Sequence, residues 1–222
     1  MKLVNCKIVS WSEIEEWTTD VSKKMANAGF KPDVVIGLTR GGWVPARLLC
    51  DIMNIKDLYA VKTEHWGVTA TRDGNAKLAQ KLSGDVKGRR VLIMDDITDT
   101  GKSLSLAMEH VRSFKPKSLR SGTLLHVTHS LIEPNYYSVE VPAENWTWFI
   151  FPWNFHEDIR TLALKTIGSP KDTKGVVKAL KDQFQIKADR EVVEEALLEL
   201  EDRGEAVCKD GKWAKSDKQS KR

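Results

Sequence analysis

A short apolar run that ends in two adjacent acids and a loop of small residues constrains this chain more than any other feature. Residues 91–103 read VLIMDDITDTGKS. The run Val91–Met94 is typical of a strand that is buried on both faces of a parallel sheet. The loop after it offers successive backbone N–H groups and leads into a helix, whose N-terminus attracts anions. The segment therefore predicts an α/β fold with an anion-binding loop at the end of a strand.

The paired acids Asp95 and Asp96 indicate what kind of anion this loop binds. Two carboxylates beside a phosphate are unfavourable unless the ligand also carries hydroxyl groups and a metal ion. Carboxylates accept hydrogen bonds from ribose hydroxyls and bind Mg²⁺ directly or through water. The alternative interpretation of these acids is that they cap the N-terminus of the next helix, but a helix cap needs only one such acid. The loop is not a P-loop, because Asp96 stands where that motif has its first glycine.

Strand and helix signals alternate along most of the chain. Further strand signals fall at Asp33–Leu38, Leu58–Lys62, Ser118–Val127 and Tyr137–Glu140, and helical spacing at Ile14–Ala28, Pro45–Met53 and Lys102–Phe114. This alternation predicts a doubly wound, mostly parallel sheet, which binds ligands at the carboxyl ends of its strands. The polar stretch 63–82 is expected to be a mobile excursion from the sheet.

The composition shifts after Leu164. Two charged amphipathic segments, Lys171–Phe184 and Ala188–Asp202, are followed by a hairpin that we expect to turn at Asp210-Gly211. We therefore predict two domains: a core over residues 1–164, and a helical or winged-helix-like appendage over residues 165–222.

Composition argues against several classes of protein. The longest apolar runs are too short to cross a bilayer, and the first residues lack the long apolar region of a secretory signal. The cysteines Cys6, Cys50 and Cys208 are far apart and odd in number, which argues against a disulfide framework. The net charge of +4 neither requires nor excludes a polyanionic partner. We expect a cytoplasmic protein without a membrane partner.

The segment Val91–Ser103 closely resembles the 5-phosphoribosyl-1-pyrophosphate (PRPP) motif of type I phosphoribosyltransferases, in its apolar run, paired acids and Asp-Thr-Gly-Lys-Ser ending. The resemblance implies that Asp95 and Asp96 hold the ribose diol and a Mg²⁺ cofactor, and that Asp99 exchanges a proton with a purine ring. It assigns the sugar 5′-phosphate to six residues: Thr98, Asp99, Thr100, Gly101, Lys102 and Ser103. The substrates implied are PRPP and a purine base.

A second segment, Val34–Arg47, resembles the pyrophosphate loop of the family's purine branch. There a strand runs into a basic residue and two glycines, here Arg40, Gly41 and Gly42. We expect a strained or cis peptide at Arg40–Gly41; a plain turn before a helix is the alternative. The stretch 63–82 falls where the family has a flexible catalytic hood. Residues 64–66 read EHW where family members often show Ser-Tyr, so the sequence does not decide which residue closes over the site.

The segment Val141–Arg160 looks like the base-binding stretch of the 6-oxopurine enzymes in this family. The resemblance implies an aromatic residue that stacks on the purine, and both Trp146 and Trp148 fit that place. It also implies that Arg160 reaches pyrophosphate. Residues 141–160 are therefore expected to form the base-binding part of the core.

Two departures from the family pattern occur at the base site. Asn154 occupies the position of a metal-binding acid, a role left open to Glu157, to Asp158, or to the substrate and water. Val127 occupies the place of a lysine that donates to O6 of 6-oxopurines. Adenine carries a donor at that position, so the missing lysine favours adenine unless a backbone group reads O6.

The sequence thus predicts a purine phosphoribosyltransferase of purine salvage, acting as a homodimer, with adenine slightly favoured over hypoxanthine, guanine and xanthine. No nucleic-acid partner is expected, since basic residues only slightly outnumber acids after Leu164. The alternative is a PRPP-sensing, nucleic-acid-binding regulator on the same scaffold, because two helices and a hairpin resemble a winged helix.

Overall fold

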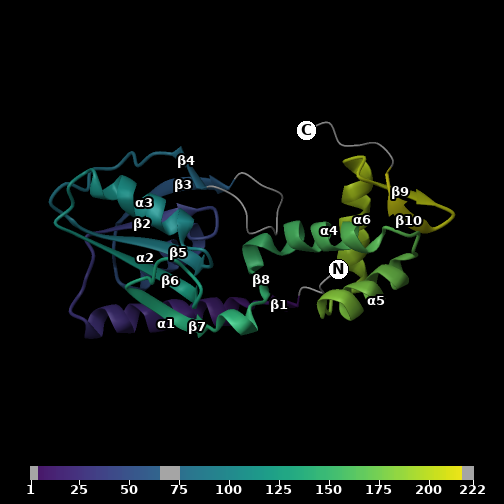
Figure 1. Ribbon diagram of the computed structural model, residues 1–222, viewed down its shortest axis with the longest axis horizontal. Helices are drawn as coiled ribbons and strands as arrows, with labels where there is room; N and C mark the ends of the chain where they lie inside the picture. The colour runs from purple at the N-terminus through teal and green to yellow at the C-terminus, as the bar shows by residue number, and fades with distance from the viewer. Residues whose placement is uncertain (1–4, 66–75, 217–222) are drawn as a thin grey trace. The chain divides into compact units, whose positions relative to one another are not determined.

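The computed structural model describes residues 5–65 and 76–216 (Figure 1). The chain divides into two compact units. The first unit is Trp11–Trp146, and the second joins the residues up to Ser10 to the chain from Thr147 onward. Within the described ranges, no helix combines the length and the apolar composition that a bilayer span requires.

A six-stranded sheet forms the centre of the first unit, in the order β4-β3-β2-β5-β6-β7. Its strands are β2 (Val34–Thr39), β3 (Asp57–His65), β4 (Ala76–Gln80), β5 (Arg90–Thr98), β6 (Ser118–Val127) and β7 (Tyr136–Val141). Neighbours run parallel except at the edge, where β4 is antiparallel to β3. This confirms the predicted doubly wound, mostly parallel fold. Part of the expected excursion at 63–82 instead belongs to the sheet, since Thr63 pairs with Leu78.

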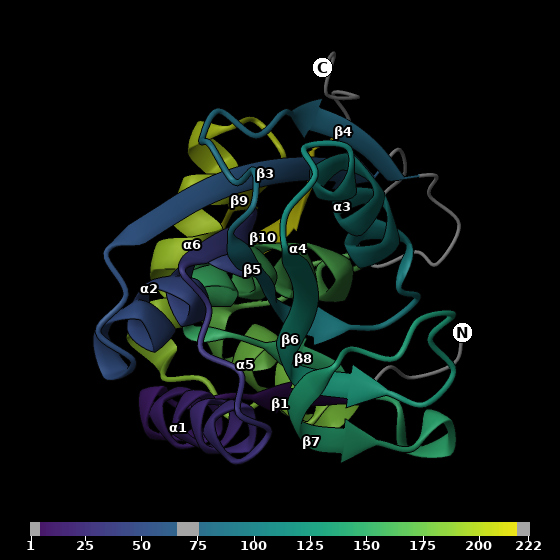
Figure 2. The ribbon, with the colours of Figure 1, turned by 90° about the vertical axis from the view of Figure 1, so that its left-hand side faces the viewer.

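Three helices of the first unit cover the two faces of the sheet: α1 (Trp11–Asn27), α2 (Trp43–Ile52) and α3 (Lys102–Arg112). On one face, α3 shares a core with alternate residues of the two central strands: Val34, Ile36, Leu38, Val91 and Ile93. On the opposite face, α2 is so close to β2 that a Cβ on Gly37 would lie 3.0 Å from Trp43. There α1 packs against α2, away from α3 (Figure 2).

The central strands β2 and β5 are adjacent, but their crossovers leave in opposite directions. β2 continues through α2 to β3 on one face, whereas β5 continues through α3 to β6 on the other. In such sheets the ligand binds at the carboxyl ends of the two strands where the order reverses. The fold therefore places residues 40–42 and 98–103 at the expected binding position.

The second unit contains a parallel strand pair, three helices and a hairpin. β1 (Cys6–Ile8) pairs with β8 (Trp148–Ile150). The other elements are α4 (Phe155–Thr166), α5 (Thr173–Phe184), α6 (Arg190–Asp202), β9 (Ala206–Lys209), β10 (Lys212–Lys215) and a short 3₁₀ helix at Pro152–Asn154. A second 3₁₀ helix, at Ala143–Asn145, belongs to the first unit. The hairpin turns at Asp210 and Gly211, both at positive φ, as expected from the sequence. Lys171 forms a β-bridge with Trp213 of β10.

The boundary between the units differs from the one expected after residue 164. Helix α4 buries Ile159, Leu162 and Ala163 in one core with residues of α5 and α6. Sequence spacing shows which face of a helix is apolar, but not which element covers it. The expected base-binding segment at 141–160 is consequently divided between the two units.

Candidate active site

The paired acids Asp95 and Asp96 lie inside the last part of β5 rather than at its end. The ladder to β6 continues past them to Thr98, which is opposite His126. The two carboxyl groups interact with each other, since both the charge and a side-chain hydrogen bond of Asp96 act on Asp95. Asp95 Oδ1 accepts from the Asp96 N–H at 3.0 Å, and Asp96 Oδ1 accepts from the Ile97 N–H at 2.8 Å. Each carboxylate is thus oriented by the backbone that follows it.

The electrostatics of the acid pair favour a bound cation. Burial and, next, the charge of Asp96 raise the pKa of Asp95 well above its ordinary value, while the backbone N–H groups of Asp96 and Gly42 act in the opposite direction. Two carboxylates, completed by substrate and water oxygens, are a donor set that suits Mg²⁺. The residues present therefore fit the expected ion. The described residues contain no cluster of three or more His, Cys, Asp or Glu that offers a fuller metal site.

The glycine loop after β2, Gly41 and Gly42, packs directly on the acid pair. A Cβ on Gly41 would lie 1.9 Å from Asp96 Oδ2, and one on Gly42 would lie 2.3 Å from the Met94 carbonyl oxygen and 2.7 Å from Asp95 Cα. A residue with a side chain does not fit at either position without a shift of its neighbours. The structure thus brings the expected pyrophosphate loop and the acid pair together.

The backbone just before this loop contains a cis peptide bond between Thr39 and Arg40. The sequence-based expectation placed a strained or cis bond at Arg40–Gly41 and is therefore wrong by one residue. Thr39 Oγ1 donates to the Val61 carbonyl at 3.2 Å, which ties the start of the loop to β3. Arg40 is exposed at the carboxyl end of β2.

The phosphate loop, residues 98–103, joins β5 to α3. Gly101 has a φ of +79°, which glycine adopts without strain, and no side-chain hydrogen bond caps α3 there. Thr100 Oγ1 is 3.5 Å from the Lys102 nitrogen, too far for a strong cap. The Thr98 Oγ1 is buried with no hydrogen-bonding partner among the described residues. Backbone N–H groups at a helix start and a buried hydroxyl suit an anion. Asp95 and Asp96 lie within β5, ahead of the residues that could cap α3.

The expected proton-exchanging residue, Asp99, contacts a histidine that the sequence analysis missed. Asp99 Oδ1 lies 2.6 Å from Nε2 of His129, which follows β6 by two residues. The Asp99 side chain is 33% exposed and that of His129 is 27% exposed. No sequence pattern reveals this pair, because the two residues leave different strands and meet only at the shared edge of the sheet.

The end of β6 carries the residues expected beside the base. Val127 is fully buried, so its side chain offers a base no polar contact. Burial lowers the pKa of the adjacent His126, whose ring lies 4.9 Å from that of Tyr137. The His126 Nδ1 is buried without a hydrogen-bonding partner in the described part of the chain. Thr128 Oγ1 accepts from the Ala143 N–H at 2.9 Å, which joins the end of β6 to the segment after β7.

The two candidate stacking residues fall in different units. Trp146 belongs to the first unit, which also carries the acid pair. Trp148 lies in β8 of the second unit, where its Nε1 donates to Asp158 at 3.1 Å. Arg160 lies in α4 of that unit and forms an ion pair of 2.6 Å with Glu199. Of Trp146, Trp148 and Arg160, Trp146 alone lies in the same unit as the phosphate loop and Arg40.

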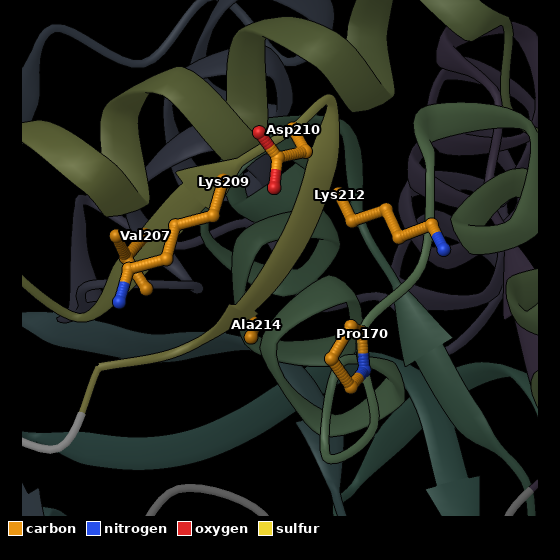
Figure 3. A pocket seen from close by; sticks show the side chains of 6 residues that line it. All are labelled: Pro170, Val207, Lys209, Asp210, Lys212 and Ala214. Atoms are coloured by element: carbon orange, nitrogen blue, oxygen red, sulfur yellow. The ribbon is translucent and has the colours of Figure 1, made fainter.

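A pocket of about 350 Å³ in the second unit contains none of the expected site residues. Figure 3 shows its lining: Pro170, Val207, Lys209, Asp210, Lys212 and Ala214. The two lysines and the aspartate come from the hairpin turn of β9 and β10, and the apolar residues form the rest of the lining. The lining has one acid and no glycine loop, so it differs from the acid pair and phosphate loop of the first unit.

Comparisons with known proteins match the first unit and the start of α4. A protein-family model for the phosphoribosyl transferase domain matches residues 10–160. The hypoxanthine phosphoribosyltransferase of Haemophilus influenzae is 32% identical over 123 residues, which are 55% of this chain and 65% of that relative, slightly less than two thirds of its length. The xanthine-guanine phosphoribosyltransferase of Cereibacter sphaeroides is 30% identical over 153 residues, 66% of this chain and 85% of the relative.

The fold comparison gives the same result. A solved structure of a purine phosphoribosyltransferase from Pyrococcus horikoshii Ot3 aligns with a TM-score of 0.57 and 29% identity, over 67% of this chain and 93% of its own. The family match contains the acid pair, the glycine loop and the phosphate loop, whereas α5, α6 and the hairpin lie beyond it.

Proposed function

The chain belongs to the phosphoribosyl transferase domain family, and on that premise we propose that it transfers a 5-phosphoribosyl group from PRPP to a purine base. The observation that carries the proposal is the position of Asp95 and Asp96, which lie against the glycine loop and on the strand that leads into α3. The acids offer acceptors for the ribose hydroxyls, and the helix start offers N–H donors for the 5′-phosphate. A phosphorylated sugar needs both.

In the proposed reaction, the bond between ribose C1 and the pyrophosphate oxygen breaks, and a bond from a purine nitrogen to C1 forms. Pyrophosphate leaves with the bonding electrons, and the proton of that nitrogen passes to the Asp99 carboxylate. Asp95, Asp96 and the phosphate loop hold C1 between the base and the leaving group, while Arg40 faces the pyrophosphate charge. Mg²⁺, when bound at the acid pair, would neutralise part of that charge.

For the base we propose a 6-oxopurine. The relatives are named for hypoxanthine and for xanthine and guanine, which share an O6 acceptor. The preference for adenine that was expected from Val127 has no support among these relatives. Because the Val127 side chain has no polar group, we propose that a backbone N–H beyond the end of β6 donates to O6 in place of a lysine.

The test is an assay of the purified chain with PRPP, Mg²⁺ and one purine at a time. We expect hypoxanthine, guanine or xanthine to give its nucleoside monophosphate with an equal amount of pyrophosphate. Adenine should react at least about tenfold more slowly, because its amino group leaves the O6 donor unpaired. Removing Mg²⁺ with EDTA should abolish product. If none of the four bases gives a nucleotide, the proposal is contradicted. If adenine turns over faster than the other bases, the choice of base is contradicted.

The arrangement of the second unit favours a second candidate, a nucleic-acid-binding regulator. α5, α6 and the hairpin follow one another as in a winged helix, and an isolated β-bridge joins Lys171, just before α5, to Trp213 of the hairpin. In a helix-turn-helix the second helix enters the major groove. On α6 the exposed charged side chains are mainly acidic: Glu191, Glu194, Glu195, Glu201 and Asp202. DNA phosphates repel such a face, so charge opposes this candidate.

We therefore expect no DNA binding through α6. The measurement is the fluorescence anisotropy of labelled duplex DNA titrated with the full chain at low and at physiological salt. Exposed lysines of α5, such as Lys174, Lys178 and Lys181, allow weak contacts at low salt that disappear as salt rises. Saturable binding that persists at physiological salt, and that strengthens when Glu194 and Glu195 are replaced by glutamine, would favour the regulator instead.

A further inference from the structure

The connection between β6 and β7 is a tightly bonded turn beside the phosphate loop. The Thr128 N–H donates to the Val141 carbonyl at 3.0 Å, and the Ser130 N–H donates to the Val127 carbonyl at 2.9 Å. The Ser130 hydroxyl donates to the Ile132 carbonyl at 2.9 Å. These bonds join the connection to the ends of both strands and give it a defined shape.

Two contacts hold the backbone of the phosphate loop against this connection. The Leu131 N–H donates to the Thr100 carbonyl at 3.2 Å. A Cβ on Gly101 would lie 2.5 Å from Ile132 Cγ2, so the two segments are in close contact. The course of the loop backbone therefore has support that does not involve the His129 side chain.

The His129 side chain acts on the carboxylate of Asp99 instead. Nε2 and Oδ1 are 2.6 Å apart, and both atoms are buried; within the described ranges neither of them has a partner in hydrogen-bond geometry. Two acceptor atoms so close together would repel each other, so we infer that Nε2 carries a proton and that a small turn of the ring lets it donate to Oδ1. The contact leaves Oδ2 as the Asp99 oxygen that is available to a ligand.

We infer that His129 is a positioning residue for the proton transfer, an inference that rests on the function proposed above. By donating to Oδ1, His129 fixes the plane of the Asp99 carboxylate and presents Oδ2 to the purine nitrogen that bonds to C1. The proton moves from that nitrogen to Oδ2, while the Nε2 proton stays on His129. A carboxylate that is already oriented lowers the barrier to this transfer without adding affinity for PRPP.

The test compares variants at position 129 that differ in the donor they offer. His129→Leu removes the donor, and we expect kcat to fall by about ten- to a hundredfold, as when other orienting groups are removed. The KM for PRPP should stay within about twofold, because binding of the sugar is not affected. His129→Gln, whose amide reaches the place of Nε2, should recover most of kcat, whereas the shorter His129→Asn should not. Glu133→Gln, at an exposed residue of the same connection, is the control and should change neither parameter.

A double-mutant cycle separates positioning from packing. If His129 acts through Asp99, adding H129L to Asp99→Asn should lower kcat no further, since residues that act as a unit have non-additive effects. Should H129L not fold, the comparison of His129→Gln with His129→Asn decides the question by itself. Full kcat in H129L, equal kcat in the glutamine and asparagine variants, or additive losses would overturn the inference. These three outcomes contradict only the role of His129, provided that the wild type still forms nucleotide. If the wild type is inactive with every purine, the proposed function itself is contradicted.

Discussion

Replacing Asp95 and Asp96 together with asparagine is expected to lower kcat/KM for nucleotide formation by at least about a hundredfold, without loss of thermal stability. Asparagine keeps the size of the side chain, but its amide nitrogen donates where the ribose hydroxyls and Mg²⁺ require acceptors. The measurement combines steady-state kinetics with PRPP and hypoxanthine with thermal unfolding of the same samples.

The stability part of this prediction follows from the pKa of Asp95. Burial and the charge of Asp96 raise that pKa in the folded chain above its ordinary value of 3.8, so between the two values the folded state binds more protons than the unfolded state. The free energy of unfolding therefore falls as the pH rises through this window, and the deficit remains at higher pH. Asp95→Asn does not titrate. Its unfolding free energy should depend less on pH in that window, and its Tm in EDTA at neutral pH should equal or exceed that of the wild type.

Asp51→Asn is the matched control for both measurements. Asp51 is exposed on α2 of the same unit and lies 3.8 Å from Arg47, an exposed ion pair of little energetic weight. The variant should change neither kcat/KM nor Tm. Undiminished turnover in the double variant would refute the assignment of the acid pair, and a large fall in its Tm would refute the electrostatic account.

Replacing Gly42 with alanine is expected to destabilise the first unit by about 1–3 kcal/mol or more, with loss of activity as a consequence. The new Cβ would lie 2.3 Å from the Met94 carbonyl oxygen, 2.7 Å from Asp95 Cα and 2.8 Å from the Leu38 carbonyl oxygen. All three are backbone atoms, which cannot rotate away as a side chain can. Either the loop after β2 must lift off β5 or the strands must shift. The change in the free energy of unfolding is measured by urea denaturation, as a shift of the midpoint urea concentration at an unchanged m-value.

Gly41→Ala should separate activity from stability. Its Cβ would lie 1.9 Å from Oδ2 of Asp96, the end of a side chain that can turn aside. The urea midpoint should therefore fall less than in Gly42→Ala, while kcat/KM falls because the carboxylate is displaced. Gly168→Ala is the control, since a Cβ there meets nothing within 4 Å. Equal midpoints for Gly42→Ala and Gly168→Ala would show that the loop does not pack on β5 as described.

The features that could be predicted from the sequence are those that depend on local pattern. Strands buried on both faces, such as the run at 91–94, appear as continuous apolar segments, and the loop after that run has the small and hydroxyl residues expected of an anion-binding loop. The extent of β5 could not be read in this way. Its apolar pattern ends at Met94, but hydrogen bonds to β6 continue through Ile97 and Thr98, because a ladder is made by the backbone whatever the side chain.

The features that could not be predicted depend on contacts between distant segments. The cis bond precedes Arg40 rather than following it, which no residue type in the loop specifies. His129 reaches Asp99 because the ends of β5 and β6 are neighbours in the sheet, a relation set by the strand order. The apolar face of helix α4 packs in one core with the C-terminal helices, although the family match includes the start of α4 and ends at residue 160.

The pairing of β1 with β8 has a consequence for biogenesis. Residues Cys6–Ile8 pair with Trp148–Ile150, so the whole first unit is inserted between the two halves of one strand pair. During translation, Trp11–Trp146 is synthesised before β8. This unit can therefore fold while β1 is still unpaired. The chain between β1 and β8 is then already folded when the two strands pair, which reduces the loop-closure entropy of that final step. The first unit should therefore fold before the strand pair that joins the two ends of the second unit.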